Sequence, residues 1–376
     1  MPTLAPPAAR YLPALDGLRA FAVLAVVAFH TDHGLRGGYL GVEVFFVLSG
    51  YLITNLLLTE SVRMGHVRLG HFYLRRAARL LPALVLAVLG VAALYTIESR
   101  VRPPLGEAVT GFAAVFLFAA NWVEAHDSGS MYFLGHTWSL AVEEQFYLVW
   151  PPVLVVLLRW RRTLRSVLVM TLVGAVASMV LRALLAFGGE GARLQAGYGS
   201  PARAGALLLG CGLAVALHVP EVAARLRRPA TAWAGLGGAV VIAVAVFVAP
   251  SDQRATFTVW LPLVALASTA LVAHCTTGTS RLTEALSLRP LVWIGRRSYG
   301  IYLFHFPILA YTHGNVAEDV GWAALAIAAA GLSYRFVESP TLRLANDRRT
   351  AVDSAPTELE HVEALDLTPA PPSTGG

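Results

Sequence analysis

The stretch that decides the fold is residues 39–59, YLGVEVFFVLSGYLITNLLLT. Glu43 is its only charged residue, and all of the others are apolar or uncharged. A helix needs about 20 residues of this kind to cross a hydrocarbon core of about 30 Å. The stretch therefore predicts a membrane-spanning helix.

The same pattern recurs along most of the chain. Of its 376 residues, 56% are hydrophobic and 14% are charged, against about 45–50% and about 25% in soluble domains. This composition excludes a disordered chain, a disulfide-rich secreted module and a nucleic-acid-binding protein. Nine further apolar runs lie at 12–31, 77–97, 138–158, 166–187, 202–219, 231–249, 257–275, 298–314 and 320–338. We predict an all-α polytopic membrane protein with about ten transmembrane helices and one short re-entrant or interfacial segment, at 108–122.

Arginines indicate the orientation of the spans. All 29 basic residues are arginines, and they concentrate in alternate loops, at 63–79, 159–165, 225–228 and 281–297. Such loops face the cytoplasm in most membrane proteins. As a helix, segment 108–122 would reach only about 22 Å, so we expect it not to complete a crossing. The prediction is a multi-pass protein of the cell membrane with both termini in the cytoplasm.

The ends of the chain differ from its middle. We expect residues 1–11 to be a cytoplasmic N-terminus, residues 12–340 to be the membrane domain, and residues 341–376 to be a disordered, acidic cytoplasmic tail. Residues 347–376 contain six acidic residues, two arginines and four prolines. The first apolar run contains Asp16 and Arg19 and is expected to be a retained helix, not a removable leader.

The first span contains the most suggestive pair of side chains, Arg19 and His30. Eleven residues of helix correspond to about three turns plus 20°, so both residues face the same way, about 16 Å apart. Charged and titratable groups inside spans are functional candidates. The alternative is that His30 marks the far interface and that Arg19 extends its charged end toward water.

Two further charged groups need partners or ligands. A carboxylate such as Glu43 inside an apolar run requires a cation, which Arg19 or a protonated His30 could supply. Arg76 and Arg79 are three residues apart and share a helix face, where they would form a fork for phosphate. Anchoring of the helix end in the cytoplasm is the alternative interpretation of these arginines.

The span at 138–158 begins with unusually polar residues, because Glu143, Glu144 and Gln145 follow one another. Glu143 and Tyr147 are four residues apart and face the same way, whereas Glu144 points elsewhere. Acidic residues also occur simply as partners of a helix N-terminus. Two other residues have two interpretations each. Asn121 either faces the acceptor or caps the short segment, and His305 either packs in the core or takes part in the site.

Six motifs then occur in a fixed order along residues 10–340. They are Asp16-Gly17-Leu18-Arg19 with His30, the run from Gly41 to Tyr51, the Arg76/Arg79 pair, Trp138-Ser139-Leu140 with Glu143, Ser298 to Pro307, and Tyr334 to Pro340. This order resembles that of the integral-membrane acyltransferase family 3. Glu43 stands where many members of that family have Asp, which alters the reach of the side chain but not its charge.

The resemblance implies transfer of a short acyl group, such as acetyl, from acyl-CoA to a hydroxyl of a sugar, a cell-envelope glycan or a macrolide. The length of the chain resembles that of stand-alone members without an esterase-like domain. No metal and no nucleic acid are expected. The expected partners are the bilayer, the acyl-CoA donor and the hydroxylated acceptor. The sequence does not indicate the oligomeric state. The competing interpretation is an ion-coupled transporter or flippase of a glycan or glycolipid.

The resemblance and the chemistry together assign the residues. We expect His30 to be the base that takes the hydroxyl proton, with Glu143 or Glu43 orienting its second ring nitrogen. Arg76 and Arg79 are expected to bind the phosphates of the donor, and Arg19 to assist either the donor or, as a catalytic residue, the oxyanion that forms during transfer. The residues expected at the substrate are Asn121, Trp138, Ser139, Glu144, Tyr147 and His305.

Overall fold

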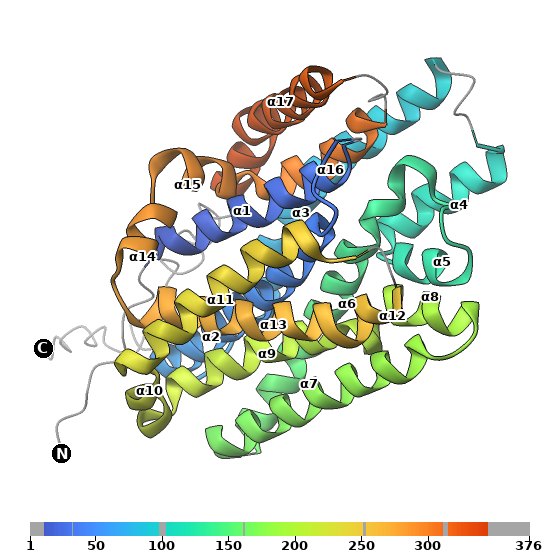
Figure 1. Ribbon diagram of the computed structural model, residues 1–376. Helices are drawn as coiled ribbons and strands as arrows, with labels where there is room; N and C mark the ends of the chain where they lie inside the picture. Colours follow the sequence, from blue (N-terminus) through green and yellow to red (C-terminus); the bar gives the residue numbers. More distant parts are fainter. Residues whose placement is uncertain are drawn as a thin grey trace, which may run out of the picture.

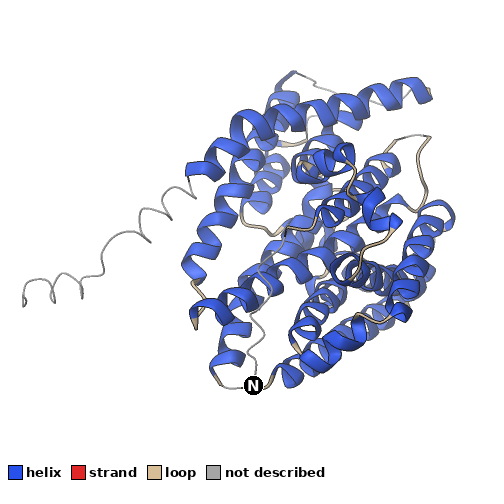
Figure 2. Ribbon diagram, turned by 90° about the vertical axis from the view of Figure 1, so that its left-hand side faces the viewer, coloured by secondary structure: helices blue, strands red, loops and turns tan. Residues whose placement is uncertain are grey.

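The fold is entirely helical in the residues that the computed structural model describes, which are 11–31, 33–97, 103–160, 162–250, 253–310 and 315–344. Figure 2 shows these helices and the loops that join them. The longer helices are α1 (Pro13–Phe29), α2 (Gly41–Met64), α3 (Leu69–Ile97), α4 (Leu105–Phe116), α6 (Trp138–Arg159), α7 (Leu164–Ala186), α9 (Ser200–His218), α11 (Pro229–Val248), α13 (Leu261–Thr277), α16 (Ser298–Leu309) and α17 (Val316–Ser333). The shorter ones are α5 (Ala120–His126), α8 (Glu190–Tyr198), α10 (Pro220–Leu226), α12 (Gln253–Ala255), α14 (Arg281–Leu286) and α15 (Arg289–Arg296), with single turns at Gly38–Leu40, Tyr132–Thr137, Thr256–Trp260 and Tyr334–Glu338.

Eight helices in the described part of the chain are long and apolar enough to cross a membrane. They coincide with eight of the ten predicted runs. The remaining two runs, 12–31 and 298–314, contain α1 and α16, which have 17 and 12 residues; residues 311–314 lie outside the described residues. The all-α, multi-pass fold class is therefore confirmed, whereas the side on which each loop lies stays a prediction.

The segment predicted to be short, 108–122, is divided between two helices, α4 and α5. The break lies at Phe118, whose φ of 51° is outside the helical range. The amide of Gln145 in α6 donates a hydrogen bond to the Phe118 carbonyl oxygen, at 2.7 Å. This contact satisfies a backbone group that the interruption of the helix leaves unpaired.

Helix α2 crosses α9 at very short range, and glycines allow it. A methyl group on Gly50 would lie 1.9 Å from the Leu207 carbonyl oxygen, and one on Gly210 would lie 2.1 Å from that of Val47. Because neither glycine has a side chain, the two backbones approach closely, as in many membrane helix pairs. The crossing brings α2 and α9 side chains to the same internal space.

Helix α1 lies inside the bundle, in contact with α2, α13, α15 and α16. In Figure 1 it passes through the middle of the molecule, while α7 and α17 lie on opposite sides. The C-terminal helical region continues to Leu344, four residues beyond the predicted end of the membrane domain at 340. Residues 1–10 and 345–376, which include most of the predicted N-terminus and tail, lie outside the described residues.

Candidate functional site

Two cavities lie along helix α1. The first has a volume of about 250 Å³, and we call it the arginine cavity because Arg19, Arg75, Arg76 and Arg79 line it. The second has a volume of about 420 Å³, and we call it the histidine cavity because His30 and His136 line it. Arg19 and His30, which were predicted to act as a pair on one helix, thus line two different cavities.

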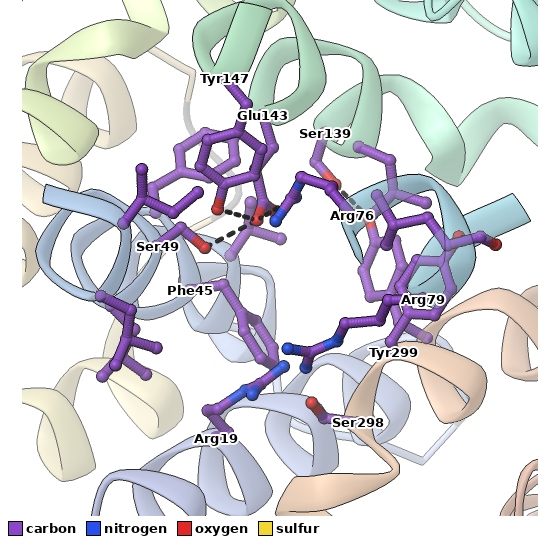
Figure 3. Close-up of a pocket in the computed structure, with 18 of the residues that line it drawn as sticks. Arg19, Phe45, Ser49, Arg76, Arg79, Ser139, Glu143, Tyr147, Ser298 and Tyr299 are labelled. Atoms are coloured by element: carbon purple, nitrogen blue, oxygen red, sulfur yellow. Dashed lines mark hydrogen bonds and ion pairs between the residues drawn. The ribbon is translucent and has the colours of Figure 1, made fainter. Parts of the chain in front are cut away.

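The arginine cavity is formed where α3 passes α1, α2, α6 and α16. Figure 3 shows that the guanidinium groups of Arg19 and Arg79 point toward each other beside Ser298. The nearest carboxylate to Arg19 is that of Asp16, at 3.9 Å, and no ion pair of Arg79 is found within the described ranges. Two guanidinium groups that face each other repel, so an anion placed between them would stabilise both.

Arg76 has a different environment from Arg79. Its Nε donates hydrogen bonds to both carboxylate oxygens of Glu144, at 2.9 and 3.0 Å, and its Nη2 contacts Glu143 and Glu144. Its guanidinium also lies 3.4 Å from the centre of the Tyr147 ring. Arg76 and Arg79 line the same cavity, but two carboxylates already contact Arg76, while Arg79 faces Arg19; the phosphate fork of Arg76 and Arg79 stays a prediction.

Glu143 is a centre of hydrogen bonding in the arginine cavity. It accepts a hydrogen bond from Ser49 at 2.7 Å and another from the Tyr147 hydroxyl, in addition to its contact with Arg76 (Figure 3). These bonds occupy the Glu143 carboxylate within the arginine cavity, whereas His30 lies at the histidine cavity. The predicted role of Glu143 as the group that orients His30 is therefore not supported by its contacts.

His30 is oriented by other groups, at the end of α1. Its Nδ1 lies 2.9 Å from the Val26 carbonyl oxygen and 3.2 Å from Nε2 of His305. A carbonyl oxygen only accepts hydrogen bonds, so Nδ1 of His30 carries the proton. His305 places its own Nδ1 at 2.6 Å from the Tyr302 carbonyl oxygen, which fixes its tautomer in the same way. His30 is left with a lone pair on Nε2, the arrangement that a general base requires.

A third histidine, His136, was missed by the sequence analysis. It lines the histidine cavity, its ring is 5.5 Å from that of His305, and it stacks on Phe306. Its two ring nitrogens have no hydrogen-bond partner among the residues that the structure describes. It precedes the predicted span 138–158 in the sequence, and nothing in its local sequence indicates burial.

A thin wall separates the two cavities. Val42 and Tyr302 line both of them. The Tyr302 hydroxyl donates to the His136 carbonyl oxygen at 2.7 Å and therefore accepts from Ser139, at 2.6 Å. Ser139, predicted to be at the substrate, thus lies in the arginine cavity and helps to hold this wall.

Glu43 lies away from both Arg19 and His30. It forms ion pairs with Arg182 of α7 at 3.0 Å and with Arg203 of α9 at 3.3 Å, and all three side chains are buried. The prediction that the first helix supplies its partner is wrong, because the α2–α9 crossing brings other cations closer. Arg182 and Arg203 were missed, although each lies inside a predicted span, where a charge marks a functional candidate.

The remaining predicted residues have separate places. Trp138 lines the histidine cavity and Tyr147 the arginine cavity. Asn121 is buried and forms hydrogen bonds with Tyr198, Ser200 and Gln145, which join α5 to the neighbouring helices. It lines neither cavity. Glu144 contacts Arg76, and His305 contacts His30. No group of residues suited to a metal ion occurs in the described ranges.

Known proteins that are similar to this chain include several named as O-acetyltransferases. A peptidoglycan O-acetyltransferase, OatA, of Listeria monocytogenes is 35% identical over 351 residues, which is 88% of this chain and 56% of that protein. An O-acetyltransferase OatA of Staphylococcus aureus is 33% identical, and a putative peptidoglycan O-acetyltransferase, YrhL, of Bacillus subtilis is 34% identical, each over 88% of this chain and 57% and 55% of their own lengths. The chain thus spans little more than half the length of these relatives.

No solved structure gives a significant match to this chain. The family model described as "Acyltransferase domain" matches residues 12–335, which include the residues lining both cavities and the first five motifs, and which end within the sixth. This chain therefore belongs to the acyltransferase domain family.

Proposed function

We propose that this chain is a membrane O-acetyltransferase that moves an acetyl group from acetyl-CoA to a hydroxyl of a cell-envelope glycan. The observation that carries the proposal is the position of α1, which places Arg19 in the arginine cavity and His30 at the histidine cavity. One helix thus holds the site proposed for the anionic donor and the residue proposed as the base in a fixed relative position.

The arginine cavity suits the phosphates of acyl-CoA. Four arginines line it; Asp16 contacts Arg19, and Glu143 and Glu144 contact Arg76. The excess positive charge at Arg19 and Arg79 favours a phosphate, which guanidinium groups bind through charge-assisted hydrogen bonds. Ser298 lies beside both arginines and adds a hydroxyl donor (Figure 3).

The histidine cavity suits a sugar. Eight aromatic side chains line it: Phe29, Tyr39, Tyr132, Trp138, Tyr198, Phe257, Tyr302 and Phe306. Tyr and Trp combine an apolar face, on which the C–H face of a pyranose ring can lie, with a polar edge. The relatives that are named peptidoglycan O-acetyltransferases support a cell-envelope glycan as the acceptor.

The reaction follows from these positions. Nε2 of His30 takes the proton of the acceptor hydroxyl, the hydroxyl oxygen forms the new ester bond, and the C–S bond of the thioester breaks. The proton then passes to the sulfur, so that free CoA thiol leaves. In this direct route the acetyl group passes the wall at Val42 and Tyr302. In the alternative route Nε2 of His30 first attacks the thioester and carries the acetyl group past the same wall while the CoA thiolate leaves; when the acceptor oxygen takes the acetyl group, its proton passes to the vacated Nε2 and then to the thiolate.

The orientation belongs to the same proposal. The arginine cavity lies at the end of α1 where Asp16 pairs with Arg296, at 3.6 Å. Arg296 belongs to the arginine-rich segment 281–297 and Arg75 to the segment 63–79, both of which face the cytoplasm under the positive-inside rule. We therefore place the arginine cavity and both termini on the cytoplasmic side, where acetyl-CoA is available.

A thiol assay tests this function. The full chain in nanodiscs is supplied with acetyl-CoA and peptidoglycan fragments, and free CoA is followed with a thiol-reactive dye while mass spectrometry detects the acetylated glycan. We expect one thiol per acetyl group transferred. Movement of a glycan across the membrane without thiol release would contradict the proposal and favour a transporter.

A further inference from the structure

The cluster formed by Glu43, Arg182 and Arg203 has an unbalanced charge. Glu43 and Arg182 have no exposed surface, and Arg203 is 3% exposed. Arginine keeps its proton in proteins, so two positive charges face one negative charge. Burying an uncompensated charge is costly, and such a charge is normally balanced by a partner.

The hydrogen bonds of the cluster are also incomplete. Among the described residues, Nη2 of Arg182 and Nε of Arg203 have no hydrogen-bond partner. Guanidinium groups offer five N–H donors, and buried donors without partners are rare. The cluster thus has one excess positive charge and two donors without a partner, of which the one on Arg203 belongs to a residue at a cavity.

Only Arg203 of this cluster lines a cavity. It lines the histidine cavity, and its guanidinium lies 5.2 Å from the Trp138 ring and 5.6 Å from the Phe46 ring, whereas Arg182 lines neither cavity. An anion that enters the histidine cavity therefore meets Arg203.

The other charged groups of this cavity do not cancel its positive charge. They are Arg193, which donates to the Gly188 carbonyl oxygen at 3.2 Å, and Glu124. Arg193 and an ionised Glu124 carry one charge of each sign, so together they leave the excess charge of the cluster unchanged. The histidine cavity thus has an excess of positive charge as well as its aromatic walls.

We propose that the histidine cavity takes an acceptor sugar bearing a carboxylate, and that Arg203 binds this carboxylate. The single negative charge of a carboxylate matches the single excess charge of the cluster, and its two oxygens suit a guanidinium group. The inference rests on the proposed function, since it uses the histidine cavity as the acceptor site. Arg203 then selects the acceptor, while His30 acts on its hydroxyl.

Binding of a matched pair of sugars tests this inference without turnover. The full chain in nanodiscs is titrated with N-acetylmuramic acid and with its methyl ester, and ligand-detected NMR reports the two affinities. A charge-assisted hydrogen bond in a buried site predicts about a tenfold preference for the acid. Equal affinity for the acid and the ester would overturn the inference.

Two variants separate contact from charge. Arg203→Gln leaves a neutral Arg182–Glu43 pair, so we expect it to fold and to bind acid and ester equally. Arg182→Gln removes the same charge from the same cluster but leaves Arg203 at the cavity, so it should weaken the preference for the acid less than Arg203→Gln does. Equal loss of preference in both variants would overturn direct binding by Arg203. Thermal unfolding of each variant establishes that it is folded.

Steady-state kinetics distinguish this inference from the proposed function. With N-acetylmuramic acid as acceptor, Arg203→Gln should raise KM and leave kcat unchanged. A fall in kcat at constant KM would overturn the inference, because it would assign the charge to the reacting oxygen instead. Equal acetylation of acid and ester would refute recognition of the carboxylate, while the proposed O-acetyltransferase function would stand. A preference for binding the acid without any acetyl transfer would refute only the proposed function.

Discussion

Nε2 of His305 lies 3.2 Å from Nδ1 of His30, and the two residues are 275 positions apart in the chain. Both histidines have Nδ1 next to a backbone carbonyl oxygen, so Nε2 of His305 accepts a hydrogen bond from Nδ1 of His30. In many hydrolases a carboxylate holds the catalytic histidine in this way. Here a neutral imidazole takes that position, which suits a low-dielectric environment, since no charge is buried.

The first prediction concerns this pair. His305→Phe keeps an aromatic ring but removes the acceptor, so His30 retains only the Val26 carbonyl oxygen as a partner. We expect kcat to fall by roughly tenfold or more, because a less well oriented base transfers protons less efficiently. KM for acetyl-CoA should not change, since the arginine cavity is untouched. Unchanged kcat would show that His305 only fills space.

The second prediction concerns His30 itself. His30→Ala should lower the transfer rate by about 10²- to 10⁴-fold, the usual contribution of a general base, as measured by thiol release. His218→Ala is a matched control, because Nδ1 of His218 also lies 2.9 Å from a backbone carbonyl oxygen four residues earlier, that of Ala214. His218 lines neither cavity. Equal activity of the two variants would exclude His30 as the base.

The third prediction concerns the donor. Arg79→Gln removes one of the two guanidinium groups that face each other in the arginine cavity, and it breaks no ion pair within the described ranges. Loss of a charge-assisted phosphate contact should raise KM for acetyl-CoA by about tenfold while the melting temperature stays the same. A normal KM would place the phosphates elsewhere.

The fourth prediction concerns Arg76, which lies in the same cavity but should behave differently. Arg76→Gln leaves the partly buried carboxylates Glu143 and Glu144 without their cation. We expect the free energy of unfolding to fall by roughly 2–4 kcal/mol, since an unpaired charge remains inside the protein. Thermal unfolding in detergent measures this effect. A stable variant with a raised KM would instead assign Arg76 to the donor.

The fifth prediction tests the α2–α9 crossing. Gly50→Ala would place a methyl group 1.9 Å from the Leu207 carbonyl oxygen, so the helices must separate. We expect a loss of about 1–3 kcal/mol of stability. Gly90→Ala is the control, because nothing lies within 4 Å of the added methyl group. If both variants unfold at the wild-type temperature, the close crossing is incorrect.

The amino-acid sequence by itself determined the fold class and the positions of the apolar runs, whereas the break at Phe118 within the predicted short segment 108–122 was seen only in the structure. The fold class and the apolar runs depend on local hydrophobicity and on the length needed to cross a bilayer, which a linear pattern contains. It also placed Arg19 and His30 on one helix face, because helical geometry relates residues that are close in the chain.

Only the tertiary structure decided which side chains meet. The partners of Glu43 and Arg76, and the pairing of His30 with His305, depend on how helices distant in sequence cross, and packing at sites such as Gly50 and Gly210 sets those crossings. Ion pairs and hydrogen bonds act over a few ångströms, so the spacing of residues along a single helix could not assign them. For the same reason His136 became a candidate only when the structure placed it in the lining of the same cavity as His30.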